Sequence, residues 1–336
     1  MQVSRVPVFL CIDLEPVERE VHDSNSDSWR GVDAIVEWLG ALRPRLADTS
    51  GEDVRLLWFL RCDPQVEVAF GAPNALMLRS ASTLDALREG GDAIGLHTHP
   101  WRWEEDEASW IADYDNPAWI EHCVDTSFEA YRSHFGRPCE LHRFGDHWLS
   151  ADVIPMLEEK GVRFDFSVEP GARSMDSIAP GERTSGSIPD YTRAPREPYR
   201  PSSADVRLPD PTARSGLWII PLSAADPGSA LPLSWRIGSR VRFPFRPLHR
   251  PLYMFREWTS PEAFWNMVQR HVDSSERPYL AFAIRSGDPE SPDEQRVRSI
   301  LEHLPEHPLG SRVVFTHPEA GLRLMGLEAA EALPEG

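Results

Sequence analysis

Two pairs of side chains that could bind a metal follow short apolar stretches of the chain. Asp13 and Glu15 come at the end of the first stretch, and His97 and His99 come at the end of a later one. Within each pair the residues are two positions apart, so on a strand both side chains project from the same face. Two carboxylates at a strand end are costly unless a cation or a hydrogen-bond donor compensates them. The spacing therefore predicts a shared polar site.

The donor set that these pairs offer is typical of a catalytic metal centre. Two histidines and one carboxylate commonly hold Zn²⁺ and leave a position open for water, and the set also suits other divalent ions such as Co²⁺, Mn²⁺ or Ni²⁺. Taken singly, an Asp-x-Glu after a strand is more often a helix cap or a solvated turn, and a His-x-His is more often a surface or core feature. Their joint appearance at strand ends favours the metal site.

Apolar stretches alternate with amphipathic helical patterns along the chain, which is typical of stacked β/α units. Seven or eight strands are expected, from the stretches 6–12, 54–60, 92–96, 139–145, 162–168, 216–222, 279–284 and 312–315. The residues expected to cap the intervening helices are Asn116, Ser150, Thr259 (with Glu262) and Ser291 (with Glu294). Catalytic groups of β/α barrels lie at the carboxyl ends of the strands, where both pairs stand.

The whole chain, 1–336, is expected to form a single (β/α)-barrel domain, because α/β barrels often use this many residues. Residues 169–215 are rich in Pro, Ser, Arg and Gly and are interpreted as a long insertion, and a second irregular stretch is expected at about 223–258. Loops of this length are usually functional or disordered.

The composition argues against several classes of partner. The chain carries a formal net charge of −18, so it repels phosphate backbones and anionic lipid heads, and neither nucleic acid nor membrane partners are expected. The four cysteines are scattered and do not suggest a disulfide framework or a zinc knuckle. The first apolar stretch is too short to span a bilayer, and no signal peptide precedes it. A cytoplasmic location is therefore expected.

Three segments of the sequence resemble the polysaccharide deacetylase, or NodB-homology, superfamily. They are IDLEP near the N-terminus, GGDAIGLHTHPW at 90–101, and LHRFGDHWLSADVIPMLEEKGVRFDFSV at 141–168; GLWIIPLS at 216–223 is similar to the sixth strand of that family. The resemblance implies a distorted (β/α) barrel of about seven strands that removes N- or O-acetyl groups from glycans with the help of a divalent metal ion.

The resemblance also implies a role for each matching residue. Asp13 corresponds to the general base, and Glu15 to a metal ligand that is usually Asp in this family. His97 corresponds to the first metal histidine. Arg143 corresponds to the arginine that orients the base, and Asp165 stands where an aspartate usually supports that arginine.

The sequence departs from the family pattern in three further respects, the first of which is a shortened arginine segment, Arg143-Phe144-Gly145, in place of a longer Pro-containing loop. The second metal histidine usually lies four residues after the first, but Trp101 stands there, so His99 must supply the second imidazole. The penultimate strand usually ends in a histidine that protonates the leaving group, whereas here it ends in IRSGD at 284–288. His317 or His147 could replace that acid, although either could equally be a surface histidine.

Other residues near the strand ends could bind a sugar. Trp101, Trp103 and Trp148 could stack on pyranose rings, although packing over the barrel rim is an equally good interpretation. Asp63 could form a polar wall of the site or could cap a helix. The basic stretch 236–256 could bind an anionic glycan, a nucleotide-sugar phosphate or a partner, or could pair with the acidic turn Glu104–Glu107.

The function that the sequence favours is metal-dependent hydrolysis of an acetyl group on a sugar or glycan. One alternative is a related glycoside hydrolase, which needs two carboxylates across the scissile bond, and only Asp13 is a convincing candidate. The other is a protein that keeps the scaffold, lacks the acid and binds a glycan or sugar nucleotide without catalysis. The missing motif histidine favours this second alternative.

Overall fold

The computed structural model describes residues 5–22, 27–177, 181–225, 250–254 and 260–327. Within these ranges, no helix combines the length and the apolar character that a membrane-spanning segment requires. The four cysteines are all buried and unpaired, as small apolar side chains are in a core.

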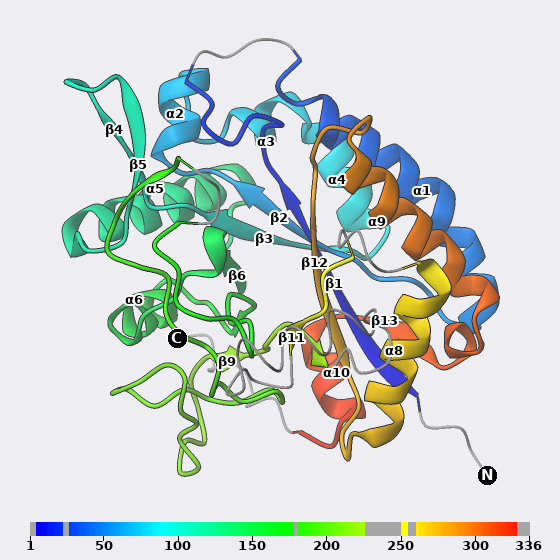
Figure 1. The fold of residues 1–336 in the computed structure, drawn as a ribbon. Coiled ribbons are helices and arrows are strands. Elements are labelled where there is room, and N and C mark those ends of the chain that lie inside the picture. The colour runs from blue at the N-terminus through cyan, green and yellow to red at the C-terminus, as the bar shows by residue number, and fades with distance from the viewer. Residues whose placement is uncertain (1–4, 23–26, 178–180, 226–249, 255–259, 328–336) are drawn as a thin grey trace.

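One curved sheet of parallel strands forms the centre of the molecule (Figure 1). Its order is β12–β1–β2–β3–β6–β7–β9, and β13 pairs in parallel with the beginning of β1. The strands are β1 (Val6–Leu14), β2 (Leu57–Arg61), β3 (Ala93–Thr98), β6 (Leu141–Phe144), β7 (Phe164–Asp165), β9 (Trp218–Ile219), β12 (Leu280–Arg285) and β13 (Val313–Phe315). The predicted distorted (β/α) barrel is confirmed.

Helices cover the outside of this sheet, with α1, α4, α8 and α9 on one side and α5 and α6 on the other (Figure 1). The helices are α1 (Arg30–Ser50), α2 (Pro64–Phe70), α3 (Ala75–Arg79), α4 (Ala81–Glu89), α5 (Pro117–Phe135), α6 (Ile154–Glu159), α8 (Pro261–Ser274), α9 (Pro292–His303) and α10 (Pro318–Leu324). The short 3₁₀ turns are η1 (Gly145–His147), η2 (Ala151–Val153), η4 (Leu304–Glu306) and η5 (Pro308–Ser311).

The two faces of β1 are buried in different cores. Leu10 and Ile12 belong to the core between the sheet and the helices, whereas Phe9 belongs to the core inside the curved sheet. Every residue of β1 is buried, as expected for a parallel strand whose outer face is covered by helices. Because side chains alternate between the faces, Asp13 and Glu15 continue the inner series.

The same alternation aims the histidines of β3 inward. Ile94 and Leu96 belong to the outer core, so His97 and His99 occupy the alternate, inner positions. Both predicted pairs therefore project into the interior of the barrel at the carboxyl ends of their strands.

The barrel is closed between β9 and β12 by the chain that follows β9. The backbone N–H of Ser223 donates to the carbonyl of Ala281 at 2.8 Å, and the backbone N–H of Ala281 donates to the Ser223 hydroxyl at 2.9 Å. These bonds replace a regular strand ladder at the closing edge.

A small second sheet was not predicted from the sequence. The hairpin of β4 (Trp101–Glu104) and β5 (Ser109–Asp113) follows β3 directly and projects beyond the main sheet (Figure 1). The strand β8 (Arg183–Ser185), which comes from the predicted insertion at 169–215, pairs with β5 in parallel. The insertion thus extends the hairpin that begins beside the histidines.

The second irregular stretch, 223–258, is described only in part. A short antiparallel pair joins β10 (Ala224–Ala225) to β11 (Arg250–Pro251). Of the basic stretch 236–256, only residues 250–254 are described; the rest of that stretch, where an anion-binding role was predicted, lies outside the described residues.

Of the four predicted helix caps, two are confirmed, one makes no capping hydrogen bond, and one falls on a residue outside the described ranges. The side chains of Asn116 and Ser291 accept hydrogen bonds from the first turns of α5 and α9, as expected. Ser150 makes no capping hydrogen bond, because a separate 3₁₀ turn precedes α6. For α8 the capping residue is Ser260, whose hydroxyl accepts from the N–H three residues on, while Thr259 lies outside the described residues.

Candidate metal centre

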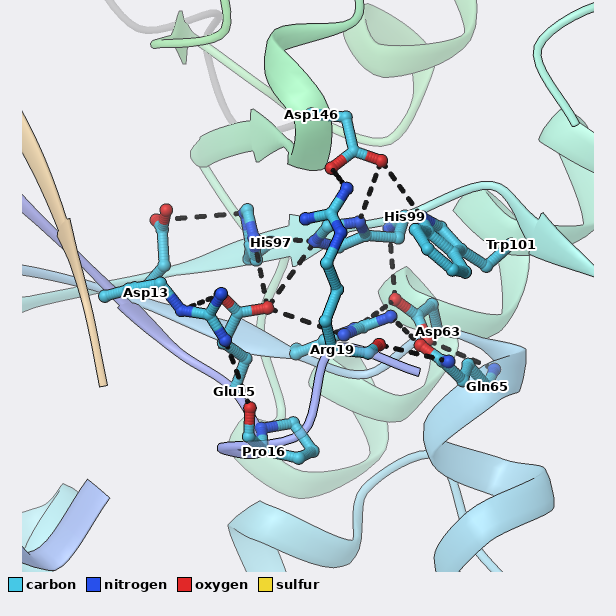
Figure 2. Close-up of polar contacts among 12 residues, drawn as sticks. Asp13, Glu15, Pro16, Arg19, Asp63, Gln65, His97, His99, Trp101 and Asp146 are labelled. Carbon is cyan, nitrogen blue, oxygen red and sulfur yellow. Dashed lines mark hydrogen bonds and ion pairs between the residues drawn. The ribbon is translucent and has the colours of Figure 1, made fainter. Parts of the chain in front are cut away.

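The carboxyl ends of β1 and β3 bring three side chains that can ligate a metal to one point (Figure 2). His97 Nε2 and His99 Nε2 are 3.0 Å apart. Glu15 Oε2 lies 4.0 Å from the first of these nitrogens and 3.6 Å from the second. All three side chains are buried.

This donor set fits a divalent ion. Atoms that each bond a zinc-sized ion at about 2.0–2.2 Å must lie within roughly 4.4 Å of one another, and all three separations meet that limit. Burial lowers the pKa of His97 to about 4, although Asp13 acts to raise it, so the ring is neutral at neutral pH. A neutral imidazole is the form that binds metal.

Two arginines compensate the buried charge of Glu15. Arg285 Nε lies 3.1 Å from Oε1 and Arg61 Nη1 lies 3.4 Å from Oε2. Burial alone would raise the pKa of Glu15, but Arg285 and the neighbouring imidazoles hold it well below its usual range. The carboxylate is therefore ionised, as a metal ligand must be.

Asp13 is held from across the barrel by Arg143. The Nε atom of Arg143 lies 3.2 Å from Oδ1 and 3.0 Å from Oδ2 of Asp13, and Nη1 donates to the carbonyl of Phe166 at 3.2 Å. Burial alone would lower the pKa of Arg143, but Asp13 raises it above its usual value, so the guanidinium stays charged. The Asp13 carboxylate lies beside the ligands, with Oδ1 3.8 Å from His97 Nδ1.

His147 faces the same space from the turn after β6. Its Nδ1 lies 2.9 Å from Glu169 Oε1, and the Tyr253 hydroxyl donates to the other oxygen of that carboxylate. Burial alone would raise the pKa of Glu169, but His147 and Tyr253 lower it below its usual range. An ionised carboxylate thus fixes one ring nitrogen of His147 and leaves Nε2 for other contacts.

These groups line one cavity of about 400 Å³, which is large enough for a sugar-sized ligand. Its remaining walls include the apolar side chains Val17, Leu222, Leu252, Met254, Phe282 and Ile284. A mostly apolar pocket with a few converging polar groups is typical of a small-molecule site.

Comparisons with known proteins support the fold. No protein-family model and no curated protein matches the sequence. A solved structure described as a probable polysaccharide deacetylase from Pseudomonas aeruginosa PAO1 matches with a TM-score of 0.53 and 13% identity, covering 96% of this chain and 91% of that one. The fold is that of the polysaccharide deacetylases. A candidate glycoside hydrolase/deacetylase from Parabacteroides distasonis matches with a TM-score of 0.54 and 11% identity, covering 93% of this chain and 70% of that one.

Within this polysaccharide-deacetylase fold, His317 lies away from the cavity, so its predicted role as an alternative acid is corrected. Its Nε2 donates to the carbonyl of Gly91 at 2.8 Å, just before the amino end of β3, whereas His97 and His99 lie at the carboxyl end of that strand. His317 follows β13, which pairs only with the first residues of β1.

The predicted sugar-stacking tryptophans are also corrected. Trp101 and Trp148 are only 1% and 3% exposed, so neither offers a free ring face. Trp101 donates from Nε1 to Asp146, and Trp148 stacks on Tyr114 with ring centroids 5.8 Å apart. Trp103 is half-buried, lies on the β4–β5 hairpin outside the cavity lining, and stacks on a histidine ring.

Asp63 is a helix cap, which was the second of its two interpretations. It is fully buried and does not line the cavity, so it forms no wall of the site. Its Oδ1 accepts from the backbone N–H groups of Gln65 and Val66 at the start of α2. Its Oδ2 accepts from Arg61 Nε at 2.8 Å and from the backbone N–H of His99 at 3.0 Å, so it still orders the strand end.

Asp165 does not support Arg143, contrary to expectation. Its Oδ2 lies 2.9 Å from Nδ1 of the buried His142, and its Oδ1 accepts from the backbone N–H of Ser167. The carbonyl of Phe166 takes its place beside the guanidinium.

Sequence reasoning missed two buried carboxylates of this site, Asp146 and Glu169. Asp146 lies in the turn after β6, and its Oδ2 is 3.5 Å from His99 Nδ1. Glu169 follows β7 and holds His147. Each lies shortly after a predicted strand, and that position was the one available signal.

Proposed function

We propose that the protein is a metal-dependent hydrolase that removes an acetyl group from an N- or O-acetylated sugar or glycan. The observation that carries the proposal is the convergence of Glu15, His97 and His99 beside an arginine-held Asp13 in one cavity. The fold alone would not be enough, because one fold supports many activities.

Glu15 Oε2 and the Nε2 atoms of His97 and His99 would hold the ion, with Zn²⁺ as the first candidate and Co²⁺, Mn²⁺ or Ni²⁺ as others. When bound, a divalent ion supplies Lewis acidity, which polarises a carbonyl group and acidifies water.

Asp13 is the proposed general base. Arg143 holds both oxygens of its carboxylate, so the carboxylate cannot rotate away from the ligand cluster. In this position it can accept the proton of a water molecule as the oxygen attacks the acetyl carbonyl carbon. The carbon–nitrogen or carbon–oxygen bond of the acetyl group then breaks, and the sugar leaves as an amine or an alcohol.

His147 is the proposed general acid. Its Nδ1 faces the Glu169 carboxylate at 2.9 Å, so its Nε2 is the nitrogen that can give a proton to the leaving group. His147 thereby takes the role of the histidine that the IRSGD segment lacks.

Acetate release from a panel of N-acetyl and O-acetyl sugars tests the proposal. We expect release by the metal-loaded protein, loss of release after chelation, and recovery when the ion is restored. Asp13→Asn should keep the metal and lose activity by about 10²–10⁴-fold, whereas Asp48→Asn, an exposed change on α1, should behave like the wild type. Full activity in Asp13→Asn would contradict its role.

The alternatives give different results in the same assay. Release of a reducing sugar without acetate would indicate a glycoside hydrolase. Binding of a sugar with neither product would indicate a protein that has kept the scaffold without catalysis.

A further inference from the structure

The turn that follows β6 has an unusual backbone. Asp146 and His147 both have φ of 55°, in the left-handed region that residues with a Cβ rarely adopt. Such conformations persist where the surrounding structure holds them, and they are concentrated at functional sites. The turn sends Asp146 toward His99 and His147 toward Glu169.

Gly145 lets this turn pass directly against His99. A Cβ at this position would lie 2.1 Å from both Cε1 and Nε2 of the His99 ring. Any larger residue would therefore displace the imidazole or the turn. This close approach places the carboxylate of the next residue, Asp146, beside Nδ1 of the ring.

Asp146 is held in place by several donors. Its Oδ2 accepts from Trp101 Nε1 at 2.9 Å and from the Tyr114 hydroxyl at 2.8 Å, and its Oδ1 pairs with the Arg19 guanidinium. Asp146 is buried and lies between β6 and β7, whereas Arg19 follows β1 and both Trp101 and Tyr114 lie between β3 and β6. This much support around one carboxylate fixes both its position and its ionised state.

The Asp146 carboxylate faces Nδ1 of His99 (Figure 2). His99 Nδ1 is buried, has no hydrogen-bond partner at normal distance among the described residues, and lies 3.5 Å from Asp146 Oδ2. A proton on Nδ1 is attracted to that oxygen, whereas a lone pair there is repelled by it. The Asp146 carboxylate therefore favours the tautomer with the proton on Nδ1 and the lone pair on Nε2. It opposes Glu15, whose Oε2 lies 3.6 Å from Nε2 and attracts a proton there.

His97 reaches the same tautomer by a different contact. Its Nδ1 lies 3.2 Å from the backbone carbonyl of Arg143, an acceptor that requires the proton on this nitrogen. With both protons on Nδ1, the Nε2 lone pairs of His97 and His99 lie 3.0 Å apart and face Glu15, an arrangement that a cation among the three groups would stabilise.

We propose that Asp146 is a positioning residue that keeps His99 in the Nδ1-protonated tautomer, so that the Nε2 lone pair faces Glu15 and His97. The inference rests on the proposed function in one respect, since it assigns His99 to the same metal centre. Carboxylates that orient a metal-binding histidine typically account for 10–100-fold in metal affinity.

The chain offers a matched control. Asp165 Oδ2 lies 2.9 Å from Nδ1 of His142, so a second buried carboxylate faces a second buried imidazole. Neither of these two residues lines the cavity. Replacing Asp165 changes a similar buried contact without touching the predicted ligands.

Nitrogen-15 NMR of histidine-labelled, metal-free protein reads the tautomer directly. In the wild type we expect Nδ1 of His99 to be protonated. Asp146→Asn, which can turn an NH₂ group toward that nitrogen, should move the proton to Nε2, while Asp165→Asn should leave His99 unchanged. Zn²⁺ titration should show a loss of about 10–100-fold in affinity for Asp146→Asn only.

Each result separates this inference from the proposed function. A wild-type His99 that is protonated on Nε2 would overturn the inference, and this holds even if Asp146→Asn does not fold. An unchanged tautomer and Zn²⁺ affinity in a folded Asp146→Asn would overturn it as well. A wild type with the expected tautomer but no Zn²⁺ affinity would support the positioning role and contradict the proposed hydrolase.

Discussion

Arg143 Nε lies 3.0 Å from Oδ2 of Asp13, although their strands are not neighbours in the sheet. Two strands, β2 and β3, separate β1 from β6 in the sheet order. The arginine side chain therefore crosses the barrel interior to hold the proposed base. This buried ion pair joins Asp13 on β1 to Arg143 on β6.

Replacing this arginine should cost both activity and stability. Arg143→Gln leaves the buried Asp13 carboxylate without its cation, and breaking a buried pair typically destabilises by about 3–5 kcal/mol. Urea unfolding and acetate release measure the two effects. Arg45→Gln, which removes one partner of an exposed pair with Glu306, should change the free energy of unfolding by about 0–1 kcal/mol. Equal stability of the two variants would contradict the interpretation.

The role of His147 predicts a dependence on the leaving group. His147→Gln removes the proton donor, so hydrolysis of an N-acetyl sugar should slow by about 10²–10⁴-fold. Hydrolysis of 4-nitrophenyl acetate should slow much less, because its leaving group departs without protonation. His317→Gln is the control and should hydrolyse both substrates like the wild type, since His317 contacts the carbonyl of Gly91 outside the cavity. Equal losses on both substrates would argue against an acid role.

Adding one methyl group at Gly145 should damage the metal centre. In Gly145→Ala the new Cβ overlaps the His99 ring, so we expect Zn²⁺ affinity to fall by at least about 10-fold and the free energy of unfolding to fall by roughly 1–3 kcal/mol. Gly40→Ala is the matched control, because a Cβ in this exposed helical position meets no atom within 4 Å. That variant should gain about 0.5–1 kcal/mol. Wild-type Zn²⁺ binding by Gly145→Ala would contradict the close approach.

The Glu169 carboxylate should contribute to the acid sensitivity of the fold. Its pKa is lowered in the folded state, so below about pH 5 the unfolded chain binds more protons than the folded one at this site. The free energy of unfolding therefore falls as the pH is lowered. Glu169→Gln lacks this contribution to the pH dependence of the free energy of unfolding. The difference in that free energy between the variant and the wild type should therefore be largest near pH 7 and shrink toward pH 3.

Urea unfolding between pH 3 and pH 7 checks this expectation. Glu121→Gln, an exposed change on α5, should follow the wild-type profile. Parallel profiles for Glu169→Gln and the wild type would show that the carboxylate has no lowered pKa in the folded state.

The parts of the site that could be predicted from the sequence are those set by strand alternation. Asp13 and Glu15 share an inner face with Phe9, and His97 and His99 share one on β3, because every second residue projects the same way. The apolar stretches around them predicted where the strands lie along the chain, because parallel strands covered on both faces are apolar along most of their length. Trp101 lies beyond the end of β3, where it donates a hydrogen bond to Asp146 and its ring centroid is 6.3 Å from that of His99.

The parts that could not be predicted depend on tertiary turns. Asp146 reaches His99 because two successive residues adopt a left-handed backbone. Asp and His adopt this conformation more often than most residues with a Cβ, but residue type alone does not place it at this turn. Glu169 meets His147 only once β6 and β7 are side by side in the sheet. Asp165 does not contact Arg143 and Asp63 does not line the cavity, because the partners of both follow from distances that no local pattern encodes.

The most direct test of the metal centre is anomalous diffraction from crystals of the protein grown with Co²⁺. We predict one strong peak at the carboxyl ends of β1 and β3, within about 2.0–2.2 Å of a Glu15 oxygen and of the Nε2 atoms of His97 and His99. A structure in which these three side chains hold no ion, while Co²⁺ binds elsewhere or nowhere, would contradict the account.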